Sequence, residues 1–303
     1  MQKRILGKTG LPVSVLGYGA MEIRGTRVWG GRALSDDQAD QVLNMVLDSG
    51  INFIDTAYDY GRSEEYIGRF ISHRRSEYVL ATKCGCSFVD KGDHDETPHV
   101  WTRENLLHNI ETSLRLMKTD HIDIWQLHNP AVDQVVSGNL IEVMEEVQAS
   151  GKVRWISISS TLPHITEYIK WGKFASFQIP YSALERQHEN AITAAHDSGA
   201  GVIIRGGVAR GAPIEAGLGN QERWAIWDKA NLDELLAPGE NRTGFLLRFT
   251  ISHPGMHTTI VGSLYPSHIA DNLRIVNTGP LPHDVYSEAK RRLEEVGEKP
   301  IEV

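Results

Sequence analysis

The sequence INFIDTAYDYGRSE, residues 51–64, joins a short apolar run to a cluster of polar side chains. Asp55 closes the apolar run, and Tyr60 follows it by five residues. Two other apolar runs end in the same way, one at Lys83 and one at His128. If these runs are parallel strands, their carboxyl ends meet at the same end of the sheet. The four side chains are therefore expected to lie together.

Short apolar runs alternate with helix-period segments along the rest of the chain, which indicates βα units and a parallel sheet. Eight strand-like runs can be counted, and 303 residues suffice for one barrel or for two average domains. With no internal repeat or Pro/Gly-rich linker, we expect one domain over residues 1–303. The eight runs lie near Val15–Gly19, Phe53–Asp55, Tyr78–Thr82, Ile122–Leu127, Trp155–Ile158, Ser176–Gln178, Val202–Ile204 and Thr259–Val261.

Several helix boundaries are predicted by capping residues. Ser35 and Thr102 are suitable N-caps because each precedes a polar first turn and then an apolar periodic stretch. Gly50, Gly151 and Gly199 follow other helical stretches, where a glycine commonly ends the helix.

The N-terminal residues predict a small hairpin. Arg4–Leu6 and Leu11–Val13 flank the turn sequence GKTG at residues 7–10. Such a hairpin could plug the bottom of a barrel.

Composition excludes several classes of protein. The formal net charge of −8 argues against a general nucleic-acid-binding surface, and no apolar run approaches the ~20 residues needed to span a bilayer. The start of the chain breaks at Gly7 and lacks a signal-peptide core. Cys84 and Cys86 are the only cysteines, which favours a reducing, cytoplasmic location. None of the 13 histidines forms a helical His-x-x-x-His pair with a fitting carboxylate, and Cys84 and Cys86 lack a second cysteine pair, so no metal site is expected.

The four residues at the strand ends suit proton transfer. A phenol has a pKa of about 10 and rarely loses its proton near neutrality. A nearby ammonium stabilises the phenolate, a carboxylate holds the ammonium, and an imidazole can orient the reacting group. Together they suit general acid–base chemistry on a carbonyl or an alcohol.

The sequences DTAYDYGRSE at 55–64, TK at 82–83 and LH at 127–128 resemble the signature of the aldo-keto reductase family. The similarity extends from Leu6 to Asn272. It implies a single-domain (β/α)8 TIM barrel, with an N-terminal β-hairpin closing the bottom and a C-terminal helix. Members use NADPH or NADH without a metal and reduce aldehydes or ketones, or run the reverse oxidation.

The resemblance also implies a role for each residue. Tyr60 stands at the family's proton-donor position, and Tyr58 is the alternative donor two residues earlier. Lys83 would lower the pKa of Tyr60, Asp55 would pair with Lys83, and His128 would help to place the substrate oxygen. The alternative for this set is an ion pair that only closes the barrel mouth.

Other matches imply cofactor contacts, and NADP(H) is expected ahead of NAD(H). Gly19 ends the first strand and Met21 follows it, in a stretch that lies by the active site in the family and whose glycines allow close approach of the cofactor. A Rossmann fingerprint needs a third glycine and an immediate helix, whereas a loop is expected after Met21. Ser159 and Gln178 match the pair that binds the nicotinamide amide, and a hydroxyl of Ser160 stands where the family has an asparagine.

The seventh strand ends differently from the family, which places a nicotinamide-stacking aromatic there. This chain has Arg205 at that position, followed by a glycine-rich turn that offers backbone N–H groups to a pyrophosphate. The alternative is a flexible loop with solvated arginines. The residues of this turn implied in cofactor binding are Gly206, Gly207, Val208 and Arg210.

The last cofactor segment should hold the adenosine phosphate. Ser263 offers a phosphate donor, and Asp271 and Asn272 match residues that hold the adenine. Gly262 and His268 stand where many members carry a lysine and an arginine for the 2′-phosphate.

Two long segments, Cys84–Trp101 and Gly206–Arg242, are predicted to be loops around the substrate or tolerated surface insertions. The side chains expected to shape the pocket are those of Trp29, Phe88, Trp101 and Trp224, with ordinary packing as the alternative for each.

The sequence therefore predicts an NADPH-dependent reductase of small carbonyl compounds, with no nucleic-acid or membrane partner and no prediction of oligomeric state. A cofactor-binding regulatory subunit with little turnover is the second hypothesis. A sugar epimerase or isomerase is the third, although the expected metal ligands are missing.

Overall fold

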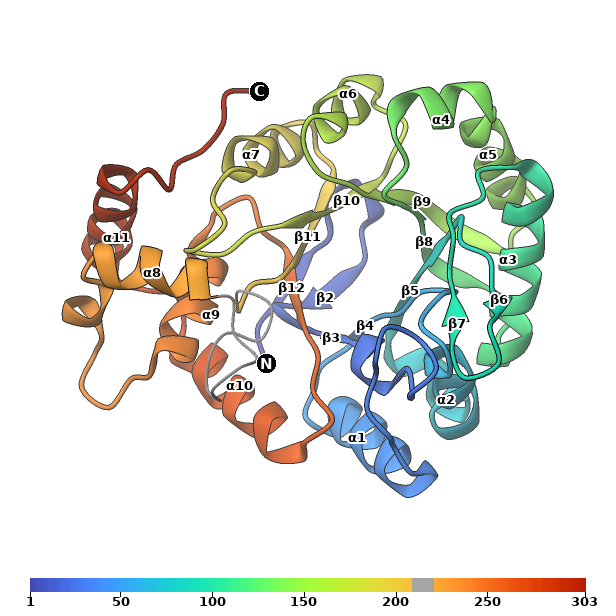
Figure 1. Cartoon of the computed structure of the whole chain (residues 1–303), viewed down its shortest axis with the longest axis horizontal. Coiled ribbons are helices and arrows are strands. Elements are labelled where there is room, and N and C mark those ends of the chain that lie inside the picture. Colours follow the sequence, from blue (N-terminus) through green and yellow to red (C-terminus); the bar gives the residue numbers. More distant parts are fainter. Residues whose placement is uncertain (209–220) are drawn as a thin grey trace.

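Eight parallel strands close into a barrel in the computed structural model, which describes residues 1–208 and 221–303 (Figure 1). Around the barrel the order is β10-β11-β12-β3-β4-β5-β8-β9, so the first and last barrel strands are neighbours. All eight predicted strands are confirmed, and each bound differs from the predicted one by at most two residues. The strands are β3 (Leu16–Gly19), β4 (Phe53–Asp55), β5 (Val79–Cys84), β8 (Ile122–His128), β9 (Val153–Ser159), β10 (Ser176–Pro180), β11 (Gly201–Arg205) and β12 (Thr258–Val261).

Helices surround the barrel as an outer layer, and the main apolar core lies between these helices and the strands (Figure 1). The predicted (β/α)8 fold is therefore confirmed. The helices are α1 (Asp36–Asp48), α2 (Ser63–Phe70), α3 (Arg103–Met117), α4 (Val132–Ser137), α5 (Leu140–Ala149), α6 (His164–Trp171), α7 (Glu189–Asp197), α8 (Gln221–Lys229), α9 (Arg242–Ser252), α10 (Pro266–Thr278) and α11 (His283–Glu295).

The predicted helix starts are confirmed at Ser35 and Thr102. The hydroxyl of Ser35 accepts from the N–H of Gln38, whose side chain accepts from the N–H of Ser35 in turn. The hydroxyl of Thr102 accepts from the N–H of Asn105. Each cap satisfies backbone donors that have no partner inside the helix.

A hairpin of β1 (Lys3–Ile5) and β2 (Pro12–Ser14) precedes the barrel, as predicted. Leu6, Leu11 and Val13 of this hairpin pack against Phe53 and Val79, the first residues of β4 and β5. The hairpin therefore covers the amino-terminal end of the barrel and leaves the opposite end open for chemistry.

The two long segments contain secondary structure. The segment after β5 forms the antiparallel pair β6 (Val89–Asp90) and β7 (Asp95–Glu96), which Arg27 binds through both Asp90 and Asp95. The segment after β11 includes α8 and the 3₁₀ helix η4 (Leu232–Leu235).

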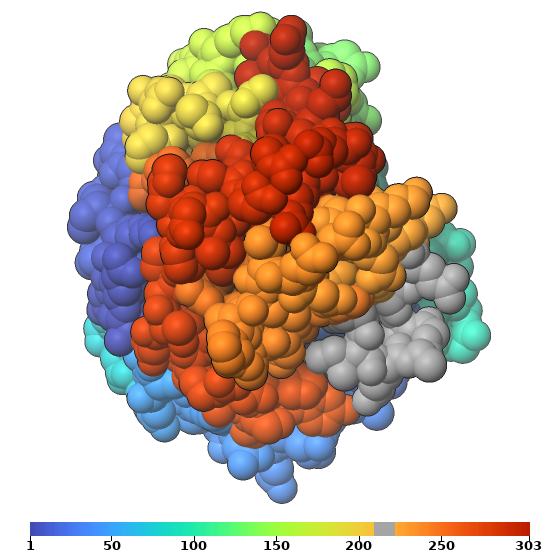
Figure 2. Space-filling view, turned by 90° about the vertical axis from the view of Figure 1, so that its left-hand side faces the viewer, coloured from blue at the N-terminus to red at the C-terminus, as the bar shows by residue number. Residues whose placement is uncertain are grey.

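A fully buried arginine attaches the predicted C-terminal helix to the barrel. Arg186 donates to the carbonyl oxygens of Lys290 and Glu298 and pairs with Glu189 and Glu294. Figure 2 shows α11, in red, lying against the orange segment that includes α8. In the part of the chain that the structure describes, no helix is both long and apolar enough to cross a membrane.

Candidate active site

The structure brings together the four residues singled out at the strand ends. Asp55 is the last residue of β4, Lys83 lies one residue before the end of β5, and His128 ends β8. These three strands are adjacent in the barrel. Tyr60 comes from the segment between β4 and α2, and its ring lies 6.0 Å from that of His128. All four lie at the carboxyl end of the barrel, where enzymes of this fold carry out their chemistry.

Lys83 and Asp55 form a buried ion pair. The distance from Lys83 Nζ to Asp55 Oδ2 is 2.5 Å, and Nζ also donates to the carbonyl oxygen of Thr56 at 2.8 Å. Both side chains are only 1% exposed. Burial would lower the pKa of Lys83, but the charge of Asp55 and its hydrogen bond outweigh that effect and raise it. Lys83 is therefore a permanent positive charge at the barrel mouth.

Two glutamines hold the other oxygen of Asp55. Gln126 and Gln178 both donate to Asp55 Oδ1, at 2.9 Å and 2.8 Å. The sequence analysis did not single out Gln126. It lies two residues before His128 on β8, and residues two apart in a strand face the same side, so strand periodicity could have identified it.

Tyr60 is enclosed by charged and aromatic groups. Lys83 Nζ lies 4.9 Å from the centre of its ring, and the ring of Trp29 lies 5.8 Å away. Burial raises the pKa of Tyr60 above its usual value; the charge of Lys83 opposes this rise, and the charge of Asp55 adds to it. The sequence analysis predicted that Lys83 lowers this pKa. That effect is confirmed, but burial is larger, so the net pKa is raised and Tyr60 is a neutral phenol.

A third carboxylate, Asp59, lies beside His128. Its Oδ1 is 3.3 Å from His128 Nδ1, and the side chain is almost fully buried. Burial raises the pKa of Asp59, but nearby His128, Cys86 and Lys83 together lower it, so it is an anion. The sequence analysis missed Asp59 and considered only its two neighbours, Tyr58 and Tyr60, as functional residues.

Glu64 is a buried carboxyl behind this site. It accepts from Thr82 Oγ1 at 2.6 Å and from Ser113 Oγ at 3.0 Å. Burial raises the pKa of Glu64 to about 7, against the opposing effect of these hydrogen bonds. The hydrogen bond between Thr82 and Glu64 therefore joins β5 to α2.

Residues expected to bind the nicotinamide amide lie side by side. Ser159 on β9 and Gln178 on β10 are register partners, and Ser160 donates its N–H to the carbonyl of Gln178 at 3.1 Å. Ser159 Oγ and Gln178 Oε1 are buried and have no hydrogen-bond partner among the described residues. Buried polar atoms are rarely left unpaired. This donor and acceptor set fits a bound carboxamide.

Arg205 ends β11, where it lies near a buried histidine. Burial lowers the pKa of His188 to about 4, against the charge of Glu185 and with a further contribution from the charge of Arg205. His188 is therefore neutral, and its Nε2 accepts from the N–H of Leu162 at 3.1 Å.

The turn after β11 requires glycine. A Cβ built on Gly207 would lie 2.6 Å from Thr259 Oγ1, and the hydroxyl of Thr250 donates to the carbonyl of Gly207. Gly206 has φ +74° and leads to Gly207 and the partly exposed Val208. The predicted contact at Arg210 falls outside the described residues.

The segment expected to hold the adenosine phosphate joins β12 to α10. Ser263 Oγ accepts from the N–H of Tyr265 at 3.0 Å and lies 3.2 Å from Nδ1 of the exposed His268. Asp271, which pairs with Arg274, and Asn272 lie further along α10.

Gly262 lies beside an acidic side chain that the sequence analysis did not consider. A Cβ built on Gly262 would lie 2.6 Å from the carbonyl oxygen of Gly19 and 3.0 Å from Cγ of Glu22. Glu22 and the exposed Met21 lie in a short 3₁₀ helix, Ala20–Ile23, where a loop was expected. No larger residue fits at position 262 without a shift of the backbone.

The four aromatic residues expected in the pocket have different surroundings. Trp29 packs on Tyr60, and Phe88 packs on Tyr58 at 5.3 Å between ring centres. Trp101 lies against Gly85, where no Cβ would fit. Trp224 contacts Trp227 and Arg242 in the outer layer.

A surface cavity lies away from these residues. It has a volume of about 610 Å³. Its lining includes Glu189 of α7, Lys290 of α11 and His253, the residue that follows α9. Proton-transfer chemistry, rather than cavity size, places the candidate site at the strand ends.

Comparisons with known proteins identify the family and support the fold. A sequence model described as "Aldo/keto reductase family" matches residues 15–294. The chain is 30% identical over 301 residues to an uncharacterized oxidoreductase, YqkF, of Bacillus subtilis, with 94% of each chain covered. It is 29% identical over 235 residues to an NADH-specific methylglyoxal reductase of Escherichia coli, covering 72% of this chain and 69% of the relative. The holo form of aldo-keto reductase AKR11C1 from Bacillus halodurans superimposes with a TM-score of 0.84, at 29% identity and 96% coverage of both chains.

Proposed function

This chain belongs to the aldo/keto reductase family, and from that premise we propose that it reduces aldehydes or ketones with a hydride from NADPH and a proton from Tyr60. The observation that carries the proposal is the neutral phenol of Tyr60 held over the buried ammonium of Lys83. A bound nicotinamide supplies the hydride, and the side chains of this protein supply the proton and the field.

Proton donation follows from the surroundings of Tyr60. As hydride reaches the carbonyl carbon, negative charge develops on the carbonyl oxygen, and the phenol of Tyr60 gives up its proton to that oxygen. The resulting phenolate is stabilised by Lys83, whose Nζ lies 4.9 Å from the centre of the Tyr60 ring. Since Lys83 attracts phenolate more strongly than phenol, its field favours the transition state over the ground state.

The surrounding hydrogen bonds keep this arrangement fixed. Asp55 accepts from Lys83 and from both glutamines, Gln126 and Gln178. The ammonium therefore keeps its position when negative charge develops on Tyr60. Asp59 pairs with the Nδ1 edge of His128, which leaves the other ring nitrogen to position the substrate oxygen. Charge stabilisation by groups that need no rearrangement is a principal source of catalysis.

We propose Ser159, Ser160 and Gln178 as the nicotinamide contacts, with the turn after β11 and the start of α10 for the phosphates. The buried, unpaired atoms of Ser159 and Gln178 support this assignment among the described residues. These residues are proposed to bind only the nicotinamide and the phosphates that NADPH and NADH share, so they do not discriminate between the two coenzymes.

NADH is a second candidate coenzyme, favoured by one observation. Gly262 has Glu22 beside it, and the carboxylate of Glu22 would repel a 2′-phosphate there. The name of the Escherichia coli relative also specifies NADH. NADPH remains the proposal because His268 and the 205–210 segment can add positive charge.

The proposed substrate is a small carbonyl compound with an apolar part, which suits the aromatic rings of Trp29 and Phe88 near the site. The proposed location is the cytoplasm. A cofactor-binding regulatory role would show itself as cofactor binding without turnover.

The test compares Tyr60→Phe with the matched control Tyr58→Phe. We expect Tyr60→Phe to lose about 10²–10⁴-fold in the rate of NADPH oxidation with 4-nitrobenzaldehyde or methylglyoxal, the usual contribution of general acid catalysis. Cofactor binding, followed by fluorescence, should stay nearly unchanged in both variants. A Tyr60→Phe rate above about half that of the wild type would contradict the proposal and transfer the role to Tyr58.

A further inference from the structure

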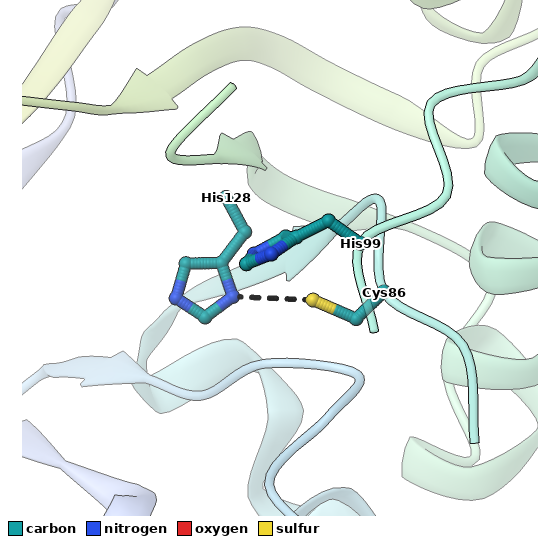
Figure 3. A group of neighbouring side chains, drawn as sticks. All are labelled: Cys86, His99 and His128. Carbon is teal, nitrogen blue, oxygen red and sulfur yellow. Dashed lines mark hydrogen bonds between the residues drawn. The ribbon is translucent and has the colours of Figure 1, made fainter. Parts of the chain in front are cut away.

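Three side chains with metal-binding atoms meet at the mouth of the barrel (Figure 3). Cys86 lies two residues beyond β5, His99 lies at the end of the following long segment, and His128 ends β8. One ligand atom from each, a thiol sulfur and two imidazole nitrogens, lies within 4.8 Å of the other two. The sequence analysis predicted no metal site because these residues are far apart in the chain and follow no metal-binding spacing.

The backbone fixes the position of two of them. Cys86 and His99 face each other in an isolated antiparallel bridge, where opposite side chains are neighbours. On either side, the N–H of Ser87 donates to the carbonyl of Pro98, and the N–H of Val100 donates to the carbonyl of Gly85. The Trp101 ring also stacks on that of His99 at 5.4 Å. The pair is therefore held by a two-stranded ribbon rather than by a free loop.

The separation of Cys86 and His128 already matches a zinc site. Their Sγ and Nδ1 atoms are 3.7 Å apart, as the dashed line in Figure 3 marks. Tetrahedral zinc, with Zn–S near 2.3 Å and Zn–N near 2.0–2.1 Å, requires a separation of about 3.6 Å. The remaining ligand, His99, is the exposed member, so a rotation of its side chain can complete the coordination.

Asp59 supplies the negative charge that such a site needs. Its Oδ2 accepts from Cys86 Sγ at 3.1 Å, and its Oδ1 lies 3.3 Å from His128 Nδ1. The buried carboxylate therefore faces two of the three side chains, Cys86 through Oδ2 and His128 through Oδ1. Its negative charge favours a cation between them.

We propose that Cys86, His99 and His128 bind a divalent transition-metal ion, with Zn²⁺ as the biological candidate, and that Asp59 is its neighbouring counter-charge. Thiolate with two imidazoles is a ligand set that zinc prefers. On binding, the Cys86 sulfur releases its proton to solvent and forms the metal–sulfur bond. The exposed side of His99 gives the ion a route in from solvent.

Occupancy should inhibit carbonyl reduction. The ion at Nδ1 of His128 would displace Asp59 from that nitrogen and so disturb the orientation of the ring, whose other nitrogen is proposed to position the substrate oxygen. This inhibition rests on the proposed role of His128, whereas metal binding itself does not.

Binding is tested directly with Co²⁺, a spectroscopic substitute for zinc. Metal-free protein titrated with Co²⁺ should develop a thiolate-to-metal charge-transfer band. The band should persist in Cys84→Ser, which removes the other buried thiol, and should vanish in Cys86→Ser. An absent band in the wild type, or a band that survives in Cys86→Ser, would overturn the proposal.

The affinity for Zn²⁺ gives a second readout through competition with a chromogenic chelator. Cys86→Ser and His99→Gln should each raise the Kd for Zn²⁺ at least about 10-fold, because even the residues that only hydrogen-bond to metal ligands commonly contribute that much to affinity. His94→Gln, an exposed histidine on the same segment, is the matched control and should leave the Kd unchanged. Equal affinity in His94→Gln and His99→Gln would overturn the assignment of His99.

Inhibition is measured last, with each variant compared with its own metal-free rate. The Zn²⁺ concentration for half-inhibition should rise at least about 10-fold in Cys86→Ser over Cys84→Ser, in line with the Kd. Metal binding without inhibition would overturn the inhibitory role alone. Metal binding in a protein that reduces no carbonyl would instead contradict the proposed function and leave the metal site supported.

Discussion

Gln178 donates a hydrogen bond of 2.8 Å to Asp55 while its own carbonyl oxygen stays buried and unpaired among the described residues. One amide therefore supports the Lys83–Asp55 ion pair and offers an acceptor to a ligand. Gln126 makes the equivalent bond to Asp55 from β8. These two glutamines provide a matched pair for separating support of the ion pair from cofactor binding.

We expect Gln178→Met to raise the Kd for NADPH by about 10-fold, because the loss of one buried hydrogen bond weakens binding by roughly 0.5–1.5 kcal/mol and an unpaired partner adds to this. Gln126→Met should lower turnover but change the Kd by less than about twofold. Fluorescence titration and steady-state rates measure the two effects. Equal changes in Kd for both variants would remove Gln178 from the cofactor site.

Coenzyme preference should depend on His268, which lies beside Ser263 near the start of α10. An imidazole N–H there can donate to the 2′-phosphate, which NADH lacks. His268→Leu should therefore lower the ratio of kcat/KM for NADPH over NADH, with both measured at one pH. An unchanged ratio would place the phosphate on other residues.

Arg205→Tyr tests the departure from the family at the end of β11. The guanidinium is a fixed positive charge, whereas the oxidised nicotinamide is cationic and the reduced ring is neutral. If Arg205 lies beneath the ring, it weakens binding of NADP⁺ relative to NADPH, and the ratio of their dissociation constants should fall in the variant. An unchanged or higher ratio would assign Arg205 to an anion contact instead.

Glu64 should make stability depend on pH. Its pKa of about 7 lies above the value of about 4.5 expected in the unfolded chain, so the folded state holds the proton more tightly. Above pH 4.5 the carboxyl loses its proton in the unfolded chain but keeps it in the folded protein. The free energy of unfolding therefore falls as the pH rises to about 7, by about 3 kcal/mol in total.

Glu64→Gln removes this titration. The difference in unfolding free energy, variant minus wild type, should rise between pH 5 and pH 8 as measured by denaturant unfolding. The comparison of two proteins cancels the other titrating groups. A difference that stays flat over this range would show that Glu64 is ionised in the folded protein.

Patterns within single segments predicted most of the fold. The runs at residues 53–55 and 122–127 became β4 and β8 because short segments rich in apolar residues are typical of the buried strands of a parallel sheet. The capping residue Ser35 was found because its partner Gln38 is three residues away. Such signals are local and need no knowledge of the tertiary structure.

The site was less accessible because parts of it depend on contacts between distant segments. Cys86 and His99 are 13 positions apart and meet only because the intervening chain turns back as a ribbon. The direction of the pKa shift at Tyr60 depends on the balance between burial and the charge of Lys83, and a sequence shows the charge but not the burial.

The pairing of β3 with β12 has a consequence for synthesis of the protein. β3 ends at Gly19, and its partner β12 ends at Val261, so about 240 further residues must be made before this edge can pair. At about 5–20 residues per second, the ribosome leaves the open strand unpaired for roughly 12–50 s. Unpaired edges can recruit strands from other chains. The growing chain therefore carries one open β3 edge, the side that later pairs with β12, until translation is nearly complete.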